Sequence, residues 1–220
     1  MPVFVPNLSM LPPPQMKLWR DLGLTPESFT LYGETALALR LGHRSSVDFD
    51  FFSNIPFDPE QLASTLPYLR DAERVQIAPD TLTGRVDRGG PVLVSFFGGL
   101  GLGQVSEHDY AQGSSLPVAS LLDIAGTKVA VVQKRAEVKD YLDIDALIQH
   151  GVSLSIALAA GSVVYGRRFN PLITLKALSF FDDVEGLPLD VRNRLSASVG
   201  AVEITRLPLL PAFVPRKKAP

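Results

Sequence analysis

The 220-residue chain contains no cysteine. Disulfide bonds and thiolate metal sites are therefore excluded, and we expect a protein of the reducing cytoplasm. An excess of charge of one sign is missing too, because 21 basic residues are balanced by 23 acidic ones, for a formal net charge of −2. The chain thus lacks the overall basic character of many nucleic-acid-binding proteins, although a local basic cluster remains compatible with this balance.

Long hydrophobic runs are also absent. The N-terminal MPVFVPNLSMLPPPQ has no basic segment followed by an unbroken apolar stretch, so it does not resemble a signal peptide. The longest mostly apolar stretch, residues 152–164, is interrupted by serines and is too short to cross a bilayer. We therefore expect no membrane partner. The few histidines lack zinc-ligand spacing, and no P-loop or dinucleotide-binding fingerprint is present.

The order of expected elements divides the chain into an α/β part and a helical part. Residues 1–13 are proline-rich and expected to be irregular, and a short helix follows over 16–22. Strands are expected at 29–32, 47–52, 75–78, 82–86 and 92–97, and helices at 34–41, 58–66, 120–132, 137–149, 156–164 and 171–181. We predict an α+β protein with an arm at residues 1–28, an α/β core at 29–116 and a helical part at 117–220. The basic end, residues 214–220, is expected to be a solvated terminus.

The stretch RSSVDFDFFS, residues 44–53, places two aspartates in an apolar strand. Because strand side chains alternate, Asp48 and Asp50 should share one face, with backbones about 7 Å apart. Two like charges there repel each other and are costly to desolvate. Such a pair can hold one or two Mg²⁺ (or Mn²⁺) ions, which then bind nucleotide phosphates. The alternative is a half-exposed edge strand with both carboxylates in solvent.

The preceding stretch LYGETALALRLGHR, residues 31–44, predicts a strand, a glycine and a helix. Gly33 at this junction lets the helix N-terminus approach an anion, where free N–H groups and the dipole favour phosphate. Thr35 can add a hydroxyl and Arg44 a guanidinium. The alternative interpretation is a plain tight turn, and His43 is more often a surface or packing residue than a ligand.

Three charged residues of the helical part have local interpretations that involve no chemistry. Lys128 lies beside an apolar helical face, which favours a snorkelling side chain over a phosphate ligand. Asp140 and Asp143 are three apart and share a helical face. Taken alone, that spacing favours a solvated face with surface ion pairs.

The combined motifs resemble those of a known family. Gly33-x-Thr35-Ala36-Leu37-Ala38-Leu39, followed by Gly42-His43-Arg44-x-Ser46-x-Asp48-x-Asp50-Phe51-Phe52, resembles the first motif of the AbiEii-type nucleotidyltransferase toxins. The later stretches VLVSFFG, VASLLDIAGTKVAVVQKRAEVKDYLDIDALI and LKALSFFDDVEGLP follow in the family's order. The resemblance covers residues 29 to 190, which is most of the chain.

This resemblance implies a DNA polymerase β-like nucleotidyltransferase fold, with a mixed β-sheet core followed by a helical C-terminal part. It implies Mg²⁺-dependent transfer of a nucleoside monophosphate from a nucleoside triphosphate to an acceptor, which is a tRNA or a protein. Such enzymes are toxins of toxin–antitoxin or abortive-infection systems, with an antitoxin protein as partner. Residues whose roles are carried over by position are Gly33, Thr35, Arg44, Ser46 and Lys128 for nucleotide binding, Asp48 and Asp50 for the metal, and Asp48, Asp50, Lys128, Asp140 and Asp143 for catalysis.

Two departures from the family pattern bear on this expectation. Glu34 replaces the second glycine of a Gly-Gly-Thr motif, and a carboxylate at an anion-binding helix start opposes phosphate. Ser95 stands where related enzymes often carry a third strand carboxylate, and the nearest acid, Asp87, lies in an expected hairpin and is not assigned. Two other interpretations therefore stay open: a catalytically impaired binding module acting through a protein partner, and a phosphotransferase on the same scaffold.

Overall fold

The computed structural model describes residues 2–214 and divides the chain into two compact units. The first consists of the residues up to Gly101 together with His108–Ala119, and the second of Leu102–Glu107 together with the residues from Ser120 onward. The sequence-based division at residues 28 and 116 stays a prediction. The expected basic end lies, apart from Val214, outside the described residues.

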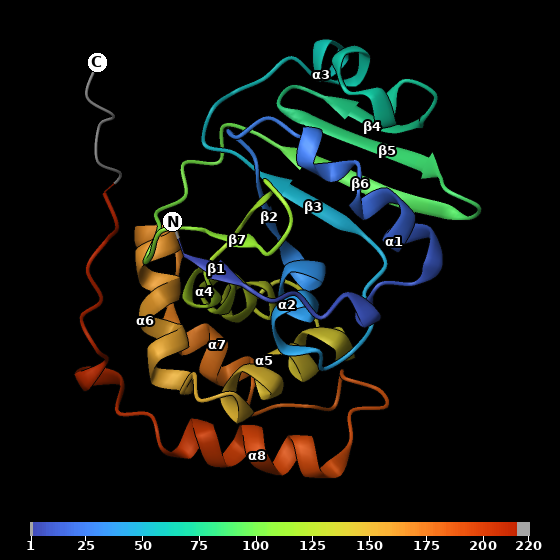
Figure 1. Cartoon of the computed structure of the whole chain (residues 1–220). Helices are drawn as coiled ribbons and strands as arrows, with labels where there is room; N and C mark the ends of the chain where they lie inside the picture. The colour runs from blue at the N-terminus through green and yellow to red at the C-terminus, as the bar shows by residue number, and fades with distance from the viewer. Residues whose placement is uncertain (1, 215–220) are drawn as a thin grey trace. The chain divides into compact units, whose positions relative to one another are not determined.

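The first unit is built on one mixed sheet of eight strands, in the order β1-β7-β8-β2-β3-β6-β5-β4 (Figure 1). The central strands β3 and β6 are parallel, whereas β2, β5 and β4 join their neighbours β3, β6 and β5 in antiparallel pairs. The strands are β1 (Val3–Phe4), β2 (Thr30–Tyr32), β3 (Phe49–Phe52), β4 (Glu73–Ala78), β5 (Thr81–Asp87), β6 (Pro91–Phe97), β7 (Asp109–Ala111) and β8 (Pro117–Val118). The sheet combines parallel and antiparallel strand pairs, and helices accompany it, which confirms the predicted α+β class.

Three helices of the first unit begin and end where the local sequence provides a signal. They are α1 (Pro13–Trp19), α2 (Gly33–Leu41) and α3 (Pro59–Thr65). Asp58 caps α3 by accepting hydrogen bonds from two backbone N–H groups of its first turn, with Pro59 in the first helical position. Gly42 ends α2 in the left-handed conformation, with φ of 64°. The helices α1 and α2 contact β6 and β3 respectively, and α3 contacts β4 and β5.

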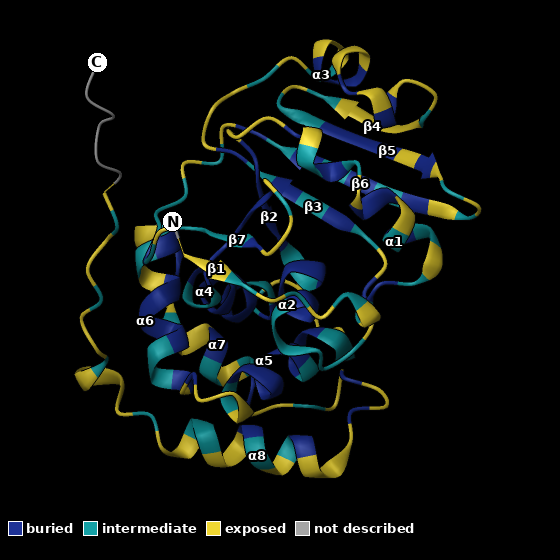
Figure 2. Ribbon diagram, viewed as in Figure 1, coloured by how far each residue is buried: buried dark blue, intermediate teal, exposed yellow. Residues whose placement is uncertain are grey.

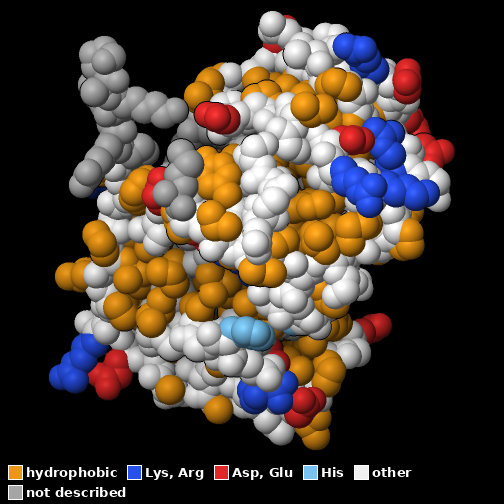
Figure 3. Space-filling model, viewed as in Figure 1, with side chains coloured by type: hydrophobic (Ala, Val, Ile, Leu, Met, Phe, Trp, Pro, Cys, Tyr) orange, Lys and Arg blue, Asp and Glu red, His pale blue; other side chains and the backbone are white. Residues whose placement is uncertain are grey.

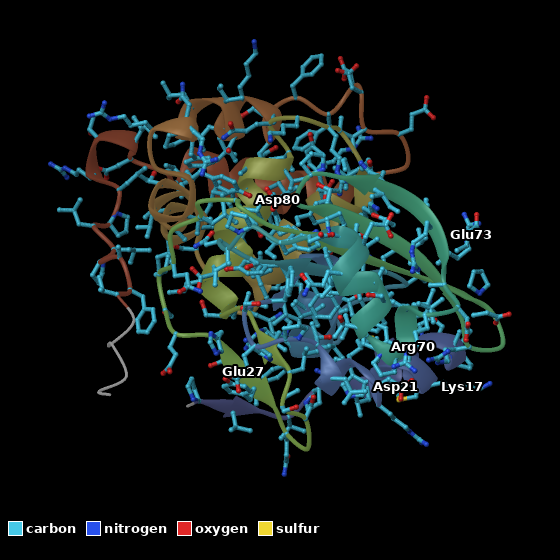
Figure 4. The ribbon with its side chains drawn as sticks, turned by 90° about the horizontal axis from the view of Figure 1, so that it is seen from above. Lys17, Asp21, Glu27, Arg70, Glu73 and Asp80 are labelled. Atoms are coloured by element: carbon cyan, nitrogen blue, oxygen red, sulfur yellow. The ribbon has the colours of Figure 1, made fainter. Side chains whose placement is uncertain are left out.

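The turn between β5 and β6 is stabilised by its own hydrogen bonds and by an ion pair with a residue that follows α1. The Asp87 carboxylate accepts hydrogen bonds from the backbone N–H groups of Gly89 and Gly90, at 2.8 and 3.0 Å, and these bonds lower the pKa of that carboxyl. Arg88 forms an ion pair with Asp21 at 3.0 Å. Asp21 and Lys17 lie together at this edge (Figure 4), and basic side chains gather near α1 on the surface (Figure 3). Asp87 thus has a structural role, as its place in the expected hairpin indicated.

The sequence interpretation was wrong at the N-terminus. Residues 1–13 were expected to be irregular, but Val3–Phe4 forms β1, which pairs in parallel with β7. The strand expected at 47–52 begins two residues later, at Phe49. The short strands β7 and β8 were not predicted, because their few residues carry no alternating pattern and are defined by pairing with distant segments.

The second unit is helical, as predicted. Its helices are α4 (Leu121–Val131), α5 (Val138–Gln149), α6 (Leu154–Tyr165), α7 (Pro171–Ala177) and α8 (Leu189–Gly200). The hydroxyl of Ser120 caps α4 by accepting the N–H of Asp123. Helix α4 is almost entirely buried, whereas α8 buries only Val191 and Leu195 (Figure 2). The sequence interpretation missed α8 and extended α7 by four residues, to 181.

Within residues 2–214, no single helix combines the length and apolar character of a membrane span. The pair Val138–Gln149 and Leu154–Arg168 meets the length and composition criteria only when taken together, across a bend of 116°.

Candidate active site

Strand β3 has one apolar face and one face that carries Asp50. Phe49 and Phe51 are fully buried, whereas Asp50 and Phe52 are half-buried on the opposite face. Asp48 directly precedes the strand and is half-buried too. The alternation follows from the pleat of the strand, and it leaves the Asp50 carboxylate on the more accessible face.

Gly33 lies against the Asp50 carboxylate. Tyr32 pairs with Asp50 across β2 and β3, and Gly33 follows as the first residue of α2. A Cβ atom at Gly33 would lie 2.6 Å from Asp50 Oδ2, and the φ of Gly33 is +73°. Both the space and the backbone conformation therefore require glycine here. The structure thus places the start of α2 next to one of the two predicted metal carboxylates.

A row of polar side chains continues from Asp50 across the neighbouring strands. Asp50 pairs with Ser95 on β6, and Ser95 pairs with Thr83 on β5. Directly paired residues point to the same face of a sheet, so the three side chains form one row. The Thr83 hydroxyl donates to the Ser95 hydroxyl at 3.1 Å. The position at which relatives often carry a third carboxylate is therefore occupied by a neutral pair of hydroxyls.

Thr35 and Ser46 are buried and hydrogen-bonded to each other. The two hydroxyls lie 2.8 Å apart, and the Thr35 hydroxyl also donates to the backbone carbonyl of Asp48. Only 1% of Thr35 and 4% of Ser46 are exposed. These contacts tie the loop between α2 and β3 to the helix and hold the backbone of Asp48. The predicted direct contact of both hydroxyls with a nucleotide stays a prediction.

Glu34, the residue that departs from the family motif, forms an ion pair with Arg44. Glu34 Oε2 and Arg44 Nη2 are 3.0 Å apart, and each side chain is 20% exposed. The negative charge at the start of α2 therefore has a cationic partner in the loop that follows the helix. The pair also occupies the guanidinium that the sequence suggested as a phosphate ligand.

Aromatic side chains that the sequence interpretation did not assign to the site lie beside Asp50. The ring of Phe52 stacks on Tyr32 with centroids 4.8 Å apart and meets the edge of Phe97 at 5.7 Å. Phe52 is two residues beyond Asp50, so the period of the strand puts it on the same face. That spacing was the signal that could have identified it.

In the second unit, Lys128 is buried between two aspartates. Its ammonium nitrogen lies 3.3 Å from Asp140 Oδ1 and 2.5 Å from Asp143 Oδ2. The lysine side chain is 4% exposed and both carboxylates are fully buried. The snorkelling lysine and the solvated aspartate face expected from local pattern were therefore wrong. Local periodicity did not reveal that α4 and α5 pack these faces against each other.

Arg135 connects this buried cluster to the surface. Its Nε lies 2.7 Å from Asp140 Oδ2 and its Nη2 lies 3.1 Å from Oδ1, in a two-point contact, while 42% of the arginine side chain is exposed. Tyr141, which follows Asp140 in α5, has a raised pKa because its phenol is buried and because the carboxylates of Asp140 and Asp183 lie nearby. The sequence interpretation did not assign Arg135 to the site. Its place five residues before Asp140 was the available signal.

Asp48 and Asp50 stay the predicted ligands of a divalent metal. Within the described part of the chain, no group of three or more His, Asp or Glu side chains is arranged around a common metal position. Magnesium in nucleotide sites is typically held by one or two carboxylates, with phosphate oxygens and water completing the shell. Two aspartates beside a helix start therefore fit a metal that arrives with a nucleotide.

Comparisons with known proteins identify the family of the chain. The sequence model of the family described as "Nucleotidyl transferase AbiEii toxin, Type IV TA system" matches residues 18–208. An uncharacterized protein of Aquifex aeolicus is 30% identical over 166 residues, which cover 70% of this chain and 74% of that protein.

Two solved structures share the fold at low sequence identity. One is the nucleotidyltransferase toxin MenT4 of Mycobacterium tuberculosis, with a TM-score of 0.58, 18% identity and coverage of 86% of this chain and 84% of that one. The other is an H. pylori protein assigned as a nucleotidyltransferase, with a TM-score of 0.54, 18% identity and coverage of 84% and 91%. The family match spans most of the sequence, and the chain belongs to the AbiEii nucleotidyltransferase toxin family of type IV toxin–antitoxin systems.

Proposed function

We propose that the protein is a Mg²⁺-dependent nucleotidyltransferase. It transfers a nucleoside monophosphate from a nucleoside triphosphate to an acceptor, a tRNA or a protein, and acts as a toxin controlled by an antitoxin protein. The observation that carries the proposal is the Asp50 carboxylate against Gly33, because it joins a metal-binding group to an anion-binding helix start.

The residues of the first unit would bind the triphosphate. Asp48 and Asp50 would hold the metal through carboxylate oxygens, and a metal bound there would supply positive charge to offset the triphosphate and the charge that develops at the reacting phosphate. Gly33 keeps the start of α2 open to phosphate oxygens. Thr35 and Ser46 act as positioning residues, because their hydrogen bonds fix the backbone of Asp48.

The residues of the second unit are assigned by the family's order of motifs. Lys128 supplies a positive charge to phosphate, and Asp140 or Asp143 orients the acceptor hydroxyl and takes its proton. In the reaction the acceptor oxygen attacks the α-phosphorus in line, the bond to the bridging oxygen breaks, and pyrophosphate leaves. In the structure the short contacts of Lys128 to both carboxylates hold the three side chains together as one buried ionic cluster.

The ion pair of Glu34 with Arg44 favours a working triphosphate site over an impaired binding module. An isolated carboxylate at a helix N-terminus would repel phosphate. Here Arg44 lies 3.0 Å away and offsets that charge. The ion pair thus offsets the charge that Glu34 brings to the start of α2.

The test is calorimetric titration of the four nucleoside triphosphates with Mg²⁺ into the wild type and Asp50→Asn. We expect Mg²⁺-dependent binding of at least one triphosphate to the wild type and its loss in Asp50→Asn, because a neutral amide is a poorer ligand for a hard cation. Asp71→Asn removes an exposed carboxylate of the same unit and is the matched control, with binding retained.

Two outcomes would contradict the proposal. Unchanged binding by Asp50→Asn would remove this carboxylate from the site. No binding of any triphosphate to the wild type, in the presence or absence of a tRNA acceptor, would favour the binding module instead.

A further inference from the structure

A pocket of about 310 Å³ opens in the second unit. It is formed by the loop after α4, by Tyr141 of α5, and by α7 with the segment that follows it. All of its walls belong to one compact unit. Its size falls at the small end of the range for small-molecule sites, which suits a ligand of one nucleotide rather than a large cofactor.

The floor and the rim of the pocket differ in chemistry. The apolar part includes the two aromatic side chains Tyr141, which is 2% exposed, and Phe180, which is 53% exposed. The rim carries the basic residues Lys134, Arg135 and Lys176 and one acid, Asp183. Flat apolar surface next to several cations is the combination that a nucleotide needs, since its base stacks on aromatic rings and its phosphate attracts basic side chains.

The basic rim charges are not equivalent. Arg135 is held by Asp140 at 2.7 Å and by Glu137 at 3.4 Å, so its charge is largely offset. Lys134 and Lys176 are exposed and form no ion pair within residues 2–214. Two lysines are therefore available to an anionic ligand, against the single carboxylate of Asp183.

We propose that this pocket is a second nucleotide-binding site, one that binds its ligand without a metal. The base lies against the exposed ring of Phe180, and the phosphate group is bound by Lys134 and Lys176. The ligand is a nucleotide, either free or as one unit of a single-stranded RNA.

Arg135 gives the pocket a direct connection to the buried charges of the same unit. Its guanidinium lines the pocket and contacts both oxygens of Asp140, and Asp140 in turn contacts Lys128. A phosphate near Arg135 would compete with Asp140 for the guanidinium. Occupancy of the pocket is therefore coupled to the residues that the family pattern assigns to catalysis.

The experiment uses the full chain in EDTA, which removes metal-dependent binding from the measurement. Adenosine monophosphate and a short single-stranded RNA are titrated separately into the wild type and the Lys134→Ala/Lys176→Ala double variant. We expect the double variant to bind at least about tenfold more weakly, and the slope of log affinity against log salt for RNA to fall by about 1.4, or about 0.7 for each lysine. The Arg167→Ala/Arg168→Ala variant removes two exposed cations of the same unit outside the pocket and should bind as the wild type does.

The stacking surface is tested by a second matched pair. Phe180→Ala removes an exposed aromatic ring from the pocket, whereas Leu172→Ala removes an exposed apolar side chain of α7 outside it. We expect weaker binding of both probes only for Phe180→Ala. Binding of the monophosphate identifies a site for free nucleotides, and binding of RNA alone identifies a site for one unit of a strand.

Two results would overturn the proposal: no binding of either probe, or equal affinity in the wild type and the double variant. The outcome is distinct from that of the triphosphate test. Loss of Mg²⁺-dependent triphosphate binding in Asp50→Asn does not depend on this pocket, and metal-free binding here does not depend on Asp50.

Discussion

Gly33 is the single residue on which the candidate triphosphate site depends most directly. Its Cα lies beside the Asp50 carboxylate, and its φ of +73° is one that other residues rarely adopt. In Gly33→Ala the new methyl group meets Asp50 Oδ2 at 2.6 Å, so the carboxylate must move. We expect loss of Mg²⁺-dependent triphosphate binding and a destabilisation of about 1–2 kcal/mol from the left-handed backbone.

Gly113→Ala separates these two effects. Gly113 has a similar φ of +79°, but nothing lies within 4 Å of a Cβ atom there. We expect the same backbone cost and unchanged triphosphate binding, measured by thermal unfolding and calorimetry. If both variants bound triphosphate equally, the contact between Gly33 and Asp50 would not matter for the site.

Lys128 is a second residue whose environment predicts a large effect. In Lys128→Met two buried carboxylates, Asp140 and Asp143, lose a cation that lies 3.3 and 2.5 Å away. Removing one partner of a buried ionic group typically costs about 3–5 kcal/mol, because the remaining charge is left uncompensated. We expect a loss of that size in the free energy of unfolding by urea.

Lys139→Met is the matched control for Lys128→Met. Lys139 is 41% exposed and pairs with Glu137 at 3.3 Å. Exposed pairs typically contribute at most about 1 kcal/mol, so the loss should be small. Similar destabilisation by both substitutions would mean that burial does not set the energy of the Lys128 cluster.

At the scale of elements, the contact between α4 and α6 depends on a small residue. A Cβ atom on Gly126 would lie 2.8 Å from the carbonyl carbon of Ala160 and 3.0 Å from the backbone N of Gly161. The two helices must separate in Gly126→Ala, and such overpacking typically costs about 1–3 kcal/mol. Gly200, in the last turn of α8, has nothing within 4 Å of a Cβ atom.

Gly200→Ala should therefore stabilise the protein, whereas Gly126→Ala should destabilise it. Alanine is preferred over glycine in helices by about 0.5–1 kcal/mol, so α8 gains stability where no neighbour opposes the methyl group. Urea denaturation of the two variants measures both effects. Stabilisation by Gly126→Ala would show that α4 and α6 do not pack closely at this point.

Local sequence signals predicted most of the helices and strands of the chain. Proline at the first helical position and an aspartate cap defined α3, and Ser120 defined the start of α4. The turn at 87–90 was recognised because Asp-Arg-Gly-Gly links two β-branched strands. The strands β1, β7 and β8 escaped prediction, since two or three residues become a strand only when a distant segment pairs with them.

The same physical limit applied to the candidate site. The periodicity of β3 indicated a face shared with Asp50, and the glycine at a strand-to-helix junction indicated an anion site. The burial of Lys128 against Asp140 could not be read locally, because helical spacing shows which residues share a face and not what covers it. Only the resemblance to a family raised these residues above a surface interpretation.

For the whole molecule, buried tyrosines predict the alkaline limit of stability. Burial raises the pKa of Tyr68 in the first unit, and burial likewise raises the pKa of Tyr141 and Tyr165 in the second. A phenol in the unfolded chain has a pKa of about 10. The unfolded chain therefore releases these protons first as the pH rises, and deprotonation favours unfolding.

The contribution of these phenols to stability is fully present below a pH of about 10 and is lost as the pH rises toward their higher folded pKa values. We expect the free energy of unfolding to fall steeply above that pH. Tyr68, which is 3% exposed and hydrogen-bonded to Thr25 at 2.7 Å, should account for much of the fall. Urea denaturation at neutral and alkaline pH tests this: Tyr68→Phe should show a shallower decline than the wild type, and an equal decline in both would assign the alkaline sensitivity to other groups.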